Sequence, residues 1–330
     1  MKLLNFTRYS EWWEYKLVPL LTVGYAAIYL ANYPPGPAIL RLLILLLSII
    51  IGAVYVSVIN DITDIKEDAK AGKKNRMAGI SKWQQTLIVS LCLIAGLFFG
   101  YLIYPDKISL FFYAMAYVVF SLYSIPPFRL KKRGIWGVFC DASGAHLFPT
   151  LLIAYNLAAV SGTVPNPVWI IAVGIWALCY GLRGILWHQF YDRENDLASG
   201  TTTFVSKVDP ANFKLQEMAL FTIEVCALCV MLWYIINPVI IQFVVFYLIL
   251  VLIRKLSFKY KTTFIISPKN APYQLLLNDY YLVFLPLSLL VTFSLNYKYG
   301  WIILLVHMLL FSQKIRHVAH DYKKFILSKI

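Results

Sequence analysis

The segment Asn60-Asp61-Ile62-Thr63-Asp64-Ile65-Lys66-Glu67-Asp68 places four carboxylates within eight residues, directly after an apolar run that covers residues 38–59. Charge beside hydrocarbon is costly, so this segment needs something that compensates it. On a helix, Asp61, Asp64 and Asp68 stand at i, i+3 and i+7 and therefore share one face. Like charges this close repel one another unless a cation binds between them. The spacing therefore predicts a site for Mg²⁺, which prefers oxygen ligands and usually also binds a substrate phosphate.

A second acidic cluster, Asp192-Arg193-Glu194-Asn195-Asp196, follows another apolar run at residues 167–190. Asp192 and Asp196 stand at i and i+4, again on one helical face. Each cluster follows the second apolar run in a group of four. This weak internal repeat predicts two four-helix pseudo-repeats, followed by C-terminal helices, that bring the clusters together across a central cavity. Two opposed sets of carboxylates, each with Mg²⁺, would clamp a diphosphate.

The composition excludes a water-soluble globular protein. Hydrophobic residues make up 60% of the 330 residues, and the mean hydropathy is +0.68. A hydrocarbon layer about 30 Å thick requires about 20 apolar residues per helix, and the chain offers roughly ten such runs. They fall at residues 17–32, 38–59, 84–104, 107–125, 138–160, 167–190, 213–236, 238–253, 276–295 and 299–313. We predict one all-α, polytopic membrane domain over residues 1–330, with nine or ten spans. The last run either spans the membrane or lies on its surface.

The net charge of +14 is explained better by membrane topology than by nucleic acid binding. If the N-terminus is cytoplasmic, almost all lysines and arginines fall on the cytoplasmic side, as the positive-inside rule requires. The exceptions are Arg41, Lys107, Lys298 and, within a span, Arg183. This asymmetry predicts an integral protein of the cell (inner) membrane with both acidic clusters on the cytoplasmic side. We expect residues 1–16 to lie at the membrane interface and residues 314–330 to form a basic cytoplasmic tail.

The two clusters also match motifs of a known family. Asn60-Asp61-x-x-Asp64-x-x-x-Asp68 resembles NDxxDxxxD, the first aspartate-rich motif of the UbiA superfamily of intramembrane prenyltransferases. Asp192-x-x-x-Asp196, followed by Leu-Ala-Ser-Gly-Thr-Thr-Thr, looks like the second motif. The resemblance in motif order and hydropathy covers roughly residues 12–295 and implies two or more Mg²⁺ ions that bridge a diphosphate. The metal ligands that it implies are Asn60, Asp61, Asp64, Asp68, Asp192 and Asp196.

The segment after the fourth apolar run departs from the short form of the family pattern. That form has Tyr-x-x-x-Lys, whereas Tyr123 is followed at this spacing by Pro127. The stretch Tyr-Ser-Ile-Pro-Pro-Phe-Arg-Leu-Lys is instead similar to the longer form in homogentisate prenyltransferases and chlorophyll synthases, which disfavours a 4-hydroxybenzoate enzyme. It implies Arg129 and Lys131 as ligands of the diphosphate. The full set of expected diphosphate-binding residues is Asn60, Arg76, Tyr123, Arg129, Lys131 and Arg183.

Four further residues are candidates on their own chemistry. Arg183 lies within a span, about two helical turns before Asp192, where either a diphosphate or an acidic partner would compensate its charge. Asp279 stands at the start of the ninth apolar run and is a candidate for deprotonating or binding an acceptor. His188, one turn before Asp192, is either a base, an acceptor ligand or a hydrogen-bonded helix residue. Arg76 follows the first cluster, although topology alone explains a basic residue there. The expected catalytic residues are Asp61, Asp64, Asp192, Asp196, Arg183 and Asp279.

The resemblance implies Mg²⁺-dependent ionisation of an allylic prenyl diphosphate, with the carbocation captured by an acceptor in a dry, aromatic pocket. An aromatic acid, a quinone precursor, a lipid alcohol or another hydrophobic compound would fit as acceptor, and no obligate protein partner is expected. Two alternatives stay open. A membrane terpene cyclase would use the same ionisation without an acceptor. A non-enzymatic transporter is also compatible with internal repeats, although it would place its charges near the middle of the membrane.

Overall fold

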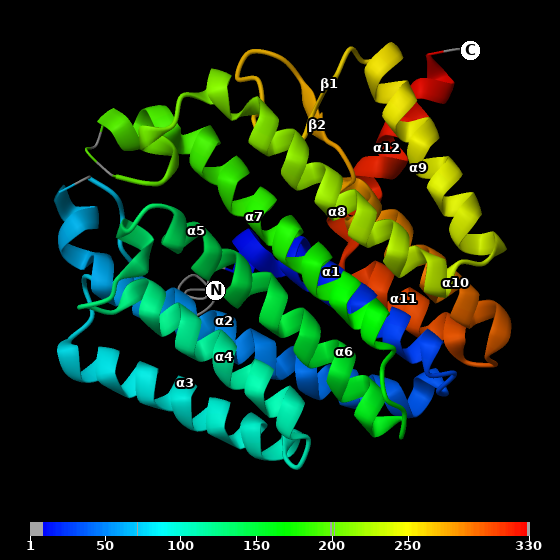
Figure 1. The fold of residues 1–330 in the computed structure, drawn as a ribbon, viewed down its shortest axis with the longest axis horizontal. Coiled ribbons are helices and arrows are strands. Elements are labelled where there is room, and N and C mark those ends of the chain that lie inside the picture. The colour runs from blue at the N-terminus through cyan, green and yellow to red at the C-terminus, as the bar shows by residue number, and fades with distance from the viewer. Residues whose placement is uncertain (1–8, 71, 199, 201, 329–330) are drawn as a thin grey trace.

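The apolar run at residues 38–59 and the acidic segment after it form one continuous helix, α2 (Pro35–Lys70). The computed structural model describes residues 9–70, 72–198, 200 and 202–328, which fold into a helical bundle (Figure 1). The other helices are α1 (Tyr9–Leu30), α3 (Lys82–Ile103), α4 (Lys107–Ser124), α5 (Ile135–Ala142), α6 (Phe148–Val160), α7 (Pro167–Ala198), α8 (Lys214–Ile235), α9 (Pro238–Leu256), α10 (Leu285–Asn296), α11 (Gly300–Leu310) and α12 (Ser312–Leu327).

Seven helices of the described chain are long and apolar enough to cross a membrane: α2, α3, α4, α5 continued through α6, α7, α8 and α9. The count rises to eight if α11 and α12, which meet at a bend of 86°, are taken as one span. The shorter apolar segment Tyr280–Asn296 and α1 pack inside the same bundle. The predicted polytopic all-helical membrane fold is confirmed, and the number of its spans is approximate.

Helix α1 lies in the interior of the bundle. In Figure 1 it runs behind α7, between α2–α4 on one side and α8 and α9 on the other. It contacts α2, α6, α8 and α10, and its apolar side chains contribute to the largest core cluster. Of the N-terminal segment expected at the interface, residues 1–8 lie outside the part of the chain that the structure describes. Trp12, at the start of α1, is buried, and Trp13 stacks on Phe311.

The connection from α4 to α5 folds back over the end of α2. It contains a 3₁₀ turn at Leu130–Lys132, and α5 packs directly beneath this turn. A Cβ atom at Gly137 would lie 2.9 Å from both the Leu130 carbonyl oxygen and the Lys131 Cα, which is closer than real Cβ atoms come to other heavy atoms. Glycine at this position therefore allows α5 to hold the turn, and with it Lys131, against the end of α2.

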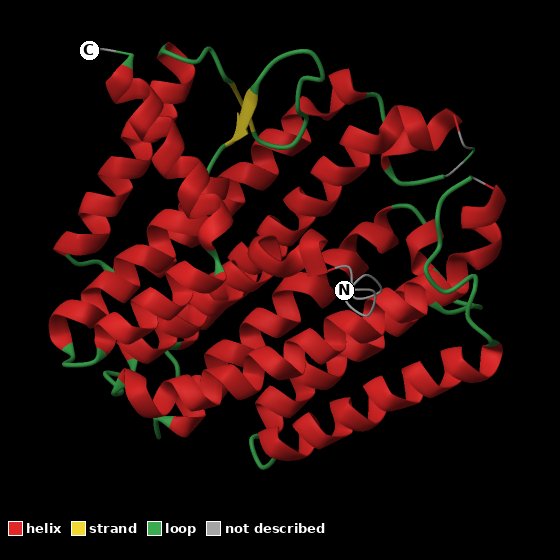
Figure 2. Cartoon of the chain, turned by 180° about the vertical axis from the view of Figure 1, so that it is seen from behind, coloured by secondary structure: helices red, strands yellow, loops and turns green. Residues whose placement is uncertain are grey.

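The C-terminal third contains two features that the apolar pattern does not predict. A short parallel pair, β1 (Lys261–Thr263) with β2 (Tyr273–Leu275), lies between α9 and α10 (yellow in Figure 2). The segment expected as a basic tail forms most of α12, which packs on α9. The Glu14 carboxylate of α1 accepts hydrogen bonds from the backbone N–H groups of Gln313 and Lys314 at the start of α12. This helix start is therefore capped by a residue from the other end of the chain.

Candidate active site

Both acidic clusters lie on the last turns of the two longest helices, α2 and α7, at the same end of the bundle. We call this the acidic end. The Lys73 ammonium, from the segment after α2, lies 3.8 Å from the Asp196 carboxylate of α7. The fold therefore brings the two predicted halves of the site within reach of one another.

Asp64 is the most heavily contacted acid of the first cluster. The Lys131 ammonium donates to both oxygens of its carboxylate, at 2.6 and 2.7 Å, and also to Asn60 Oδ1 at 2.7 Å. Arg129 Nη2 donates to Asp64 Oδ1 at 2.7 Å. Burial lowers the pKa of the Lys131 ammonium from its ordinary value, while the Asp64 carboxylate acts in the opposite direction. The two cations predicted from the sequence thus lie against the acidic face of α2.

Arg129 adopts an unusual backbone conformation. Its φ of +40° is in the left-handed region, which a non-glycine residue adopts only at an energetic cost. The guanidinium is fixed by the Thr63 carbonyl oxygen at 3.0 Å and the Glu67 carboxylate at 2.7 Å, in addition to Asp64. Lys132 forms a further ion pair with Glu67. The surrounding contacts therefore hold the strained residue at the mouth of the site.

The other two acids of α2 contact the segment that follows the helix. Arg76 Nη1 lies 4.0 Å from Asp61 Oδ2. Asp68 Oδ2 accepts a hydrogen bond of 2.7 Å from the side-chain amide of Asn75. Sequence reasoning did not single out Asn75. In the sequence, Asn75 stands in a Lys-Asn-Arg tripeptide shortly after the acidic segment. This composition is typical of any polar loop and does not indicate a role for Asn75.

The second cluster is more open. His188 Nδ1 lies 3.0 Å from Asp192 Oδ2, and the imidazole is well exposed. Lys269, from the segment between the two strands, forms an ion pair with Glu194. Together with Lys73 at Asp196, each of the three acids thus has a basic neighbour. These basic side chains are exposed, although the Asp196 carboxylate itself is buried.

Arg183 has an acidic partner within the bundle. Its guanidinium donates to both carboxylate oxygens of Glu224, at 2.8 and 2.9 Å, and Glu224 is completely buried. Arg183 Nη1 also donates to the Leu276 carbonyl oxygen at 2.7 Å, and the Tyr281 hydroxyl donates to Glu224 at 2.8 Å. These contacts account for the charge of Arg183 without a substrate. They also anchor the end of the segment that carries Lys269.

Two other sequence candidates differ in their surroundings. Asp279 is buried against Arg254, which also pairs with Asp321 of α12 at 2.8 Å. This network joins α9 and α12 to the segment that leads into α10. Tyr123 of α4 packs edge-on against Phe120, and the hydroxyl of the next residue, Ser124, donates to Asn60 Oδ1 at 3.4 Å. Tyr123 itself thus packs on Phe120 while its neighbour Ser124 contacts the first cluster, whereas the contacts of Asp279 are those of a residue that holds helices together.

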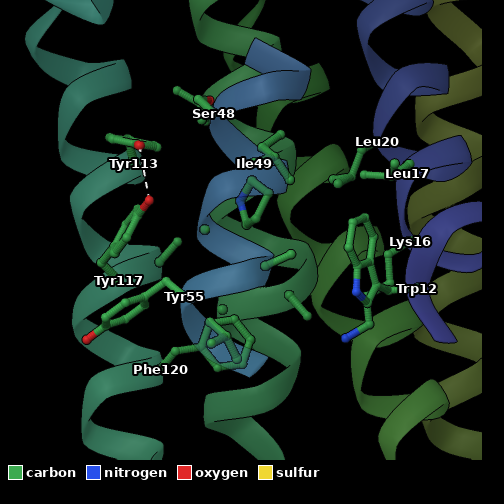
Figure 3. Close-up of a pocket in the computed structure, with 18 of the residues that line it drawn as sticks. Trp12, Lys16, Leu17, Leu20, Ser48, Ile49, Tyr55, Tyr113, Tyr117 and Phe120 are labelled. Carbon is green, nitrogen blue, oxygen red and sulfur yellow. Dashed lines mark hydrogen bonds between the residues drawn. The ribbon is translucent and has the colours of Figure 1, made fainter. Parts of the chain in front are cut away.

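An apolar pocket lies within the bundle, on the side of the first cluster that faces the middle of α2 (Figure 3). It lies between α1, α2, α4 and the α5–α6 span, and the empty space there, open solvent at its mouth included, amounts to about 780 Å³. Figure 3 shows Tyr55 of α2 with Tyr117 and Phe120 of α4 on one side, and Trp12 and Lys16 of α1 on the other. On α2 its lining runs from Ser48 to Ser57, one turn before Asn60. The pocket and the first cluster therefore occupy neighbouring stretches of the same helix.

The donors of the two clusters have the chemistry that Mg²⁺ requires, because carboxylate and amide oxygens are hard ligands. Within the described ranges, however, no three acidic, histidine or cysteine side chains are grouped as a metal site. Asp64 is instead compensated by Lys131 and Arg129. The residues thus fit the ion by type, and in this structure the charge of Asp64 is balanced by the protein's own cations.

Comparison with protein families agrees with this geometry. Residues 18–271 match the model of the UbiA prenyltransferase family. The chain belongs to this family. The match includes both acidic clusters, Lys131 and the pocket-lining parts of α2 and α4. The predicted family resemblance is confirmed. A comparison with curated proteins finds no match.

Among solved structures, the chain is similar to a UbiA homologue from Archaeoglobus fulgidus. In the form bound to GPP and Mg²⁺, the TM-score is 0.51 at 14% sequence identity, over 97% of this chain and 99% of that chain. In the form bound to DMAPP and Mg²⁺, the TM-score is 0.47 at 13% identity, with the same coverage. At such low identity the first likeness shows a shared fold, and it extends over nearly the whole chain.

Proposed function

We propose that this protein transfers a prenyl group from an allylic prenyl diphosphate to a hydrophobic or aromatic acceptor, with Mg²⁺ bound at the acidic end. The observation that carries the proposal is the position of Lys131 and Arg129. They bind Asp64 near the end of α2, and Lys131 also binds Asn60, one turn beyond the α2 residues that line an apolar, aromatic pocket. A prenyl diphosphate needs charged groups for its diphosphate and an adjacent apolar space for its prenyl chain. Membership in a prenyltransferase family and the Mg²⁺-bound prenyl diphosphates of the archaeal homologue support the same reading.

The proposed metal ligands are the acids of the first cluster with Asn60, and Asp192 and Asp196 of the second. Bound Mg²⁺ would supply neutralisation of the diphosphate charge. Lys131 and Arg129 exchange Asp64 for phosphate oxygens as the substrate enters, because both groups are anions that the same donors can bind. When the allylic C–O bond breaks, its electron pair leaves with the diphosphate, and these two cations stabilise the developing charge.

The pocket receives the prenyl chain. From Ser48 to Asn60 there are twelve helical steps, or about 18 Å of helix. The ring faces of Tyr55, Tyr117 and Phe120 border this space, and such faces stabilise a nearby cation while the apolar wall excludes water. The acceptor then forms the new bond to the allylic carbon and releases a proton. The distribution of basic residues supports a cytoplasmic position for the acidic end and a place in the cell membrane.

The test uses the full-length protein in detergent or nanodiscs with geranyl, farnesyl or geranylgeranyl diphosphate and Mg²⁺. We expect Mg²⁺-dependent binding of the matching unreactive thiodiphosphates. In the presence of acceptors, prenylated product and diphosphate should form. Asp64→Asn and Asp192→Asn should abolish both, whereas Asp209→Asn, an exposed acid that caps a short 3₁₀ helix, should not. Unchanged Mg²⁺-dependent binding in both variants would contradict the proposal, and a cyclic hydrocarbon formed without acceptor would identify a cyclase instead.

A further inference from the structure

The segment that connects α2 to α3 folds back onto the acidic face of α2. We call residues 72–80 the strap. The Lys73 backbone N–H donates to the Asp68 carbonyl oxygen at 2.8 Å, so the strap starts by turning back over the helix end. Met77 is completely buried and anchors the middle of the strap. Gln85 of α3 donates to the Met77 and Ile80 carbonyl oxygens at 2.9 and 3.0 Å. The strap is thus fixed at both ends and in its middle.

Asn75 is the side chain that joins the strap to the acids. Its Nδ2 donates to the Asp61 carbonyl oxygen at 2.8 Å and to Asp68 Oδ2 at 2.7 Å. Its Oδ1 accepts from the Met77 backbone N–H at 2.8 Å. The partners fix the orientation of the amide, because the reverse would place its oxygen against two other oxygens. One amide therefore spans two turns of α2 and fixes the backbone of the strap in the same contact.

The residues on either side of Asn75 reach both halves of the site. Arg76 lies 4.0 Å from Asp61 of the first cluster, and Lys73 lies 3.8 Å from Asp196 of the second. The position of these two cations depends on the path of the strap, and Asn75 fixes that path on the face of α2 that carries the acids. Loss of the amide would therefore loosen Asp68, Arg76 and Lys73 together.

The chemistry of an amide suits this position. At Asp64 the neighbours are Lys131 and Arg129, whose positive charges compete with any bound metal ion. At Asp68 the neighbour is a neutral donor, which orients the carboxylate and leaves its negative charge in place. A lysine in place of Asn75 would neutralise Asp68, and an aspartate would repel it. Among side chains of this size, an amide offers both donors and an acceptor without a charge.

We infer that Asn75 is a positioning residue for diphosphate binding: it orients Asp68 towards the metal–diphosphate complex and holds the strap so that Arg76 and Lys73 face the same ligand. This inference rests on the proposed function. The inference adds to the proposed site a residue outside the aspartate motifs and a physical link between the two clusters.

The test compares Asn75→Leu, which removes all three hydrogen bonds at similar size, with Gln84→Ala. Gln84 belongs to the capping box at the start of α3, so its loss loosens the far end of the strap without touching an acid. Binding of geranyl thiodiphosphate is measured against Mg²⁺ concentration, and thermal unfolding is measured without ligand. We expect Asn75→Leu to raise the Mg²⁺ concentration for half-maximal binding about tenfold, and Gln84→Ala to change it less than twofold. Asn75→Ser, which keeps one donor, should give an intermediate value and serves as the second variant if Asn75→Leu does not fold.

Equal shifts for Asn75→Leu and Gln84→Ala would overturn the inference, because they would mean that Asn75 merely stabilises the loop. A lowered unfolding temperature of Asn75→Leu with an unchanged Mg²⁺ dependence would overturn it as well. If the wild-type protein shows no Mg²⁺-dependent thiodiphosphate binding at all, the proposed function fails and this inference fails with it. If the wild type binds and the two variants do not differ, only the inference fails.

Discussion

The two acidic clusters differ in how their basic partners reach them. At the first cluster, Lys131 and Arg129 lie on a short turn packed against the same helix end, and the side chains of Lys131 and Asp64 are only 12% and 18% exposed. At the second, Lys269 reaches Glu194 from a long connection, and the Glu194 side chain is 74% exposed. The first cluster is thus preassembled within the fold. The second depends on flexible side chains from segments that are anchored elsewhere.

This difference indicates a division of work. A preassembled set of cations and acids costs little ordering when a diphosphate arrives, so the first cluster is suited to bind it. An open set of acids can adapt to the ligand and its metal ions. Substitutions at the first cluster should therefore affect both stability and activity. Substitutions of the exposed partners at the second cluster should have small effects, except where they break the buried anchor of the connection.

That buried anchor should give the largest effect on stability. Glu224→Ala leaves the Arg183 guanidinium buried without its carboxylate, which costs about 3–5 kcal/mol of folding free energy. The unfolding temperature in detergent measures this loss. Thr222→Ala, an exposed position on the same helix α8, is the matched control and should leave it unchanged.

The double variant Arg183→Met/Glu224→Leu then separates two roles of Arg183. Apolar residues of similar volume often replace a buried ion pair without loss of stability, so we expect the unfolding temperature to recover. If Arg183 only anchors the connection to β2, prenyl diphosphate binding should recover too. A stable double variant that no longer binds the thiodiphosphate would instead make Arg183 a substrate ligand, which is one of the two interpretations that the sequence left open.

The next largest effect should be at Lys131. Lys131→Met removes the cation that contacts Asp64 and Asn60, and loss of one preorganised donor of this kind lowers turnover by about 10²–10³-fold. Lys132→Met is the control, because Lys132 and Glu67 form an exposed pair worth about 0–1 kcal/mol. Turnover of prenyl diphosphate under saturating Mg²⁺ is the measurement. Similar turnover in the two variants would remove the distinction drawn between buried and exposed cations.

The sequence was sufficient for the fold class because membrane spans leave a strong signal. Twenty-residue apolar runs and the one-sided distribution of basic residues predict a helical membrane bundle directly. The count of spans is less predictable. Helix α1 is interrupted by polar residues yet packs in the core, and the run at residues 299–313 bends where α12 begins. Both outcomes depend on packing between distant segments.

The candidate site was predictable where a motif lies on one helix. Asp61, Asp64 and Asp68 share a face by spacing alone, and Lys131 and Arg129 followed from the family resemblance. The partner of Arg183 was not predictable, because Glu224 lies 41 residues away on α8 within an apolar sequence. Asn75 was missed for a similar reason. Its role depends on the strap folding back onto α2, which a polar loop composition does not predict.

The smallest effect should be at Lys269. Lys269→Ala removes an exposed ion pair at Glu194, so we expect an unchanged unfolding temperature and prenyl diphosphate turnover within about threefold of the wild type. Raising the salt concentration should reduce even this difference, because exposed charges are screened. Lys261→Ala, on β1 in the same connection, is the matched control. A loss at Lys269 comparable to that at Lys131 would contradict the division between a preassembled and an open cluster, since it would show that an exposed lysine contributes as much to the site as a buried one.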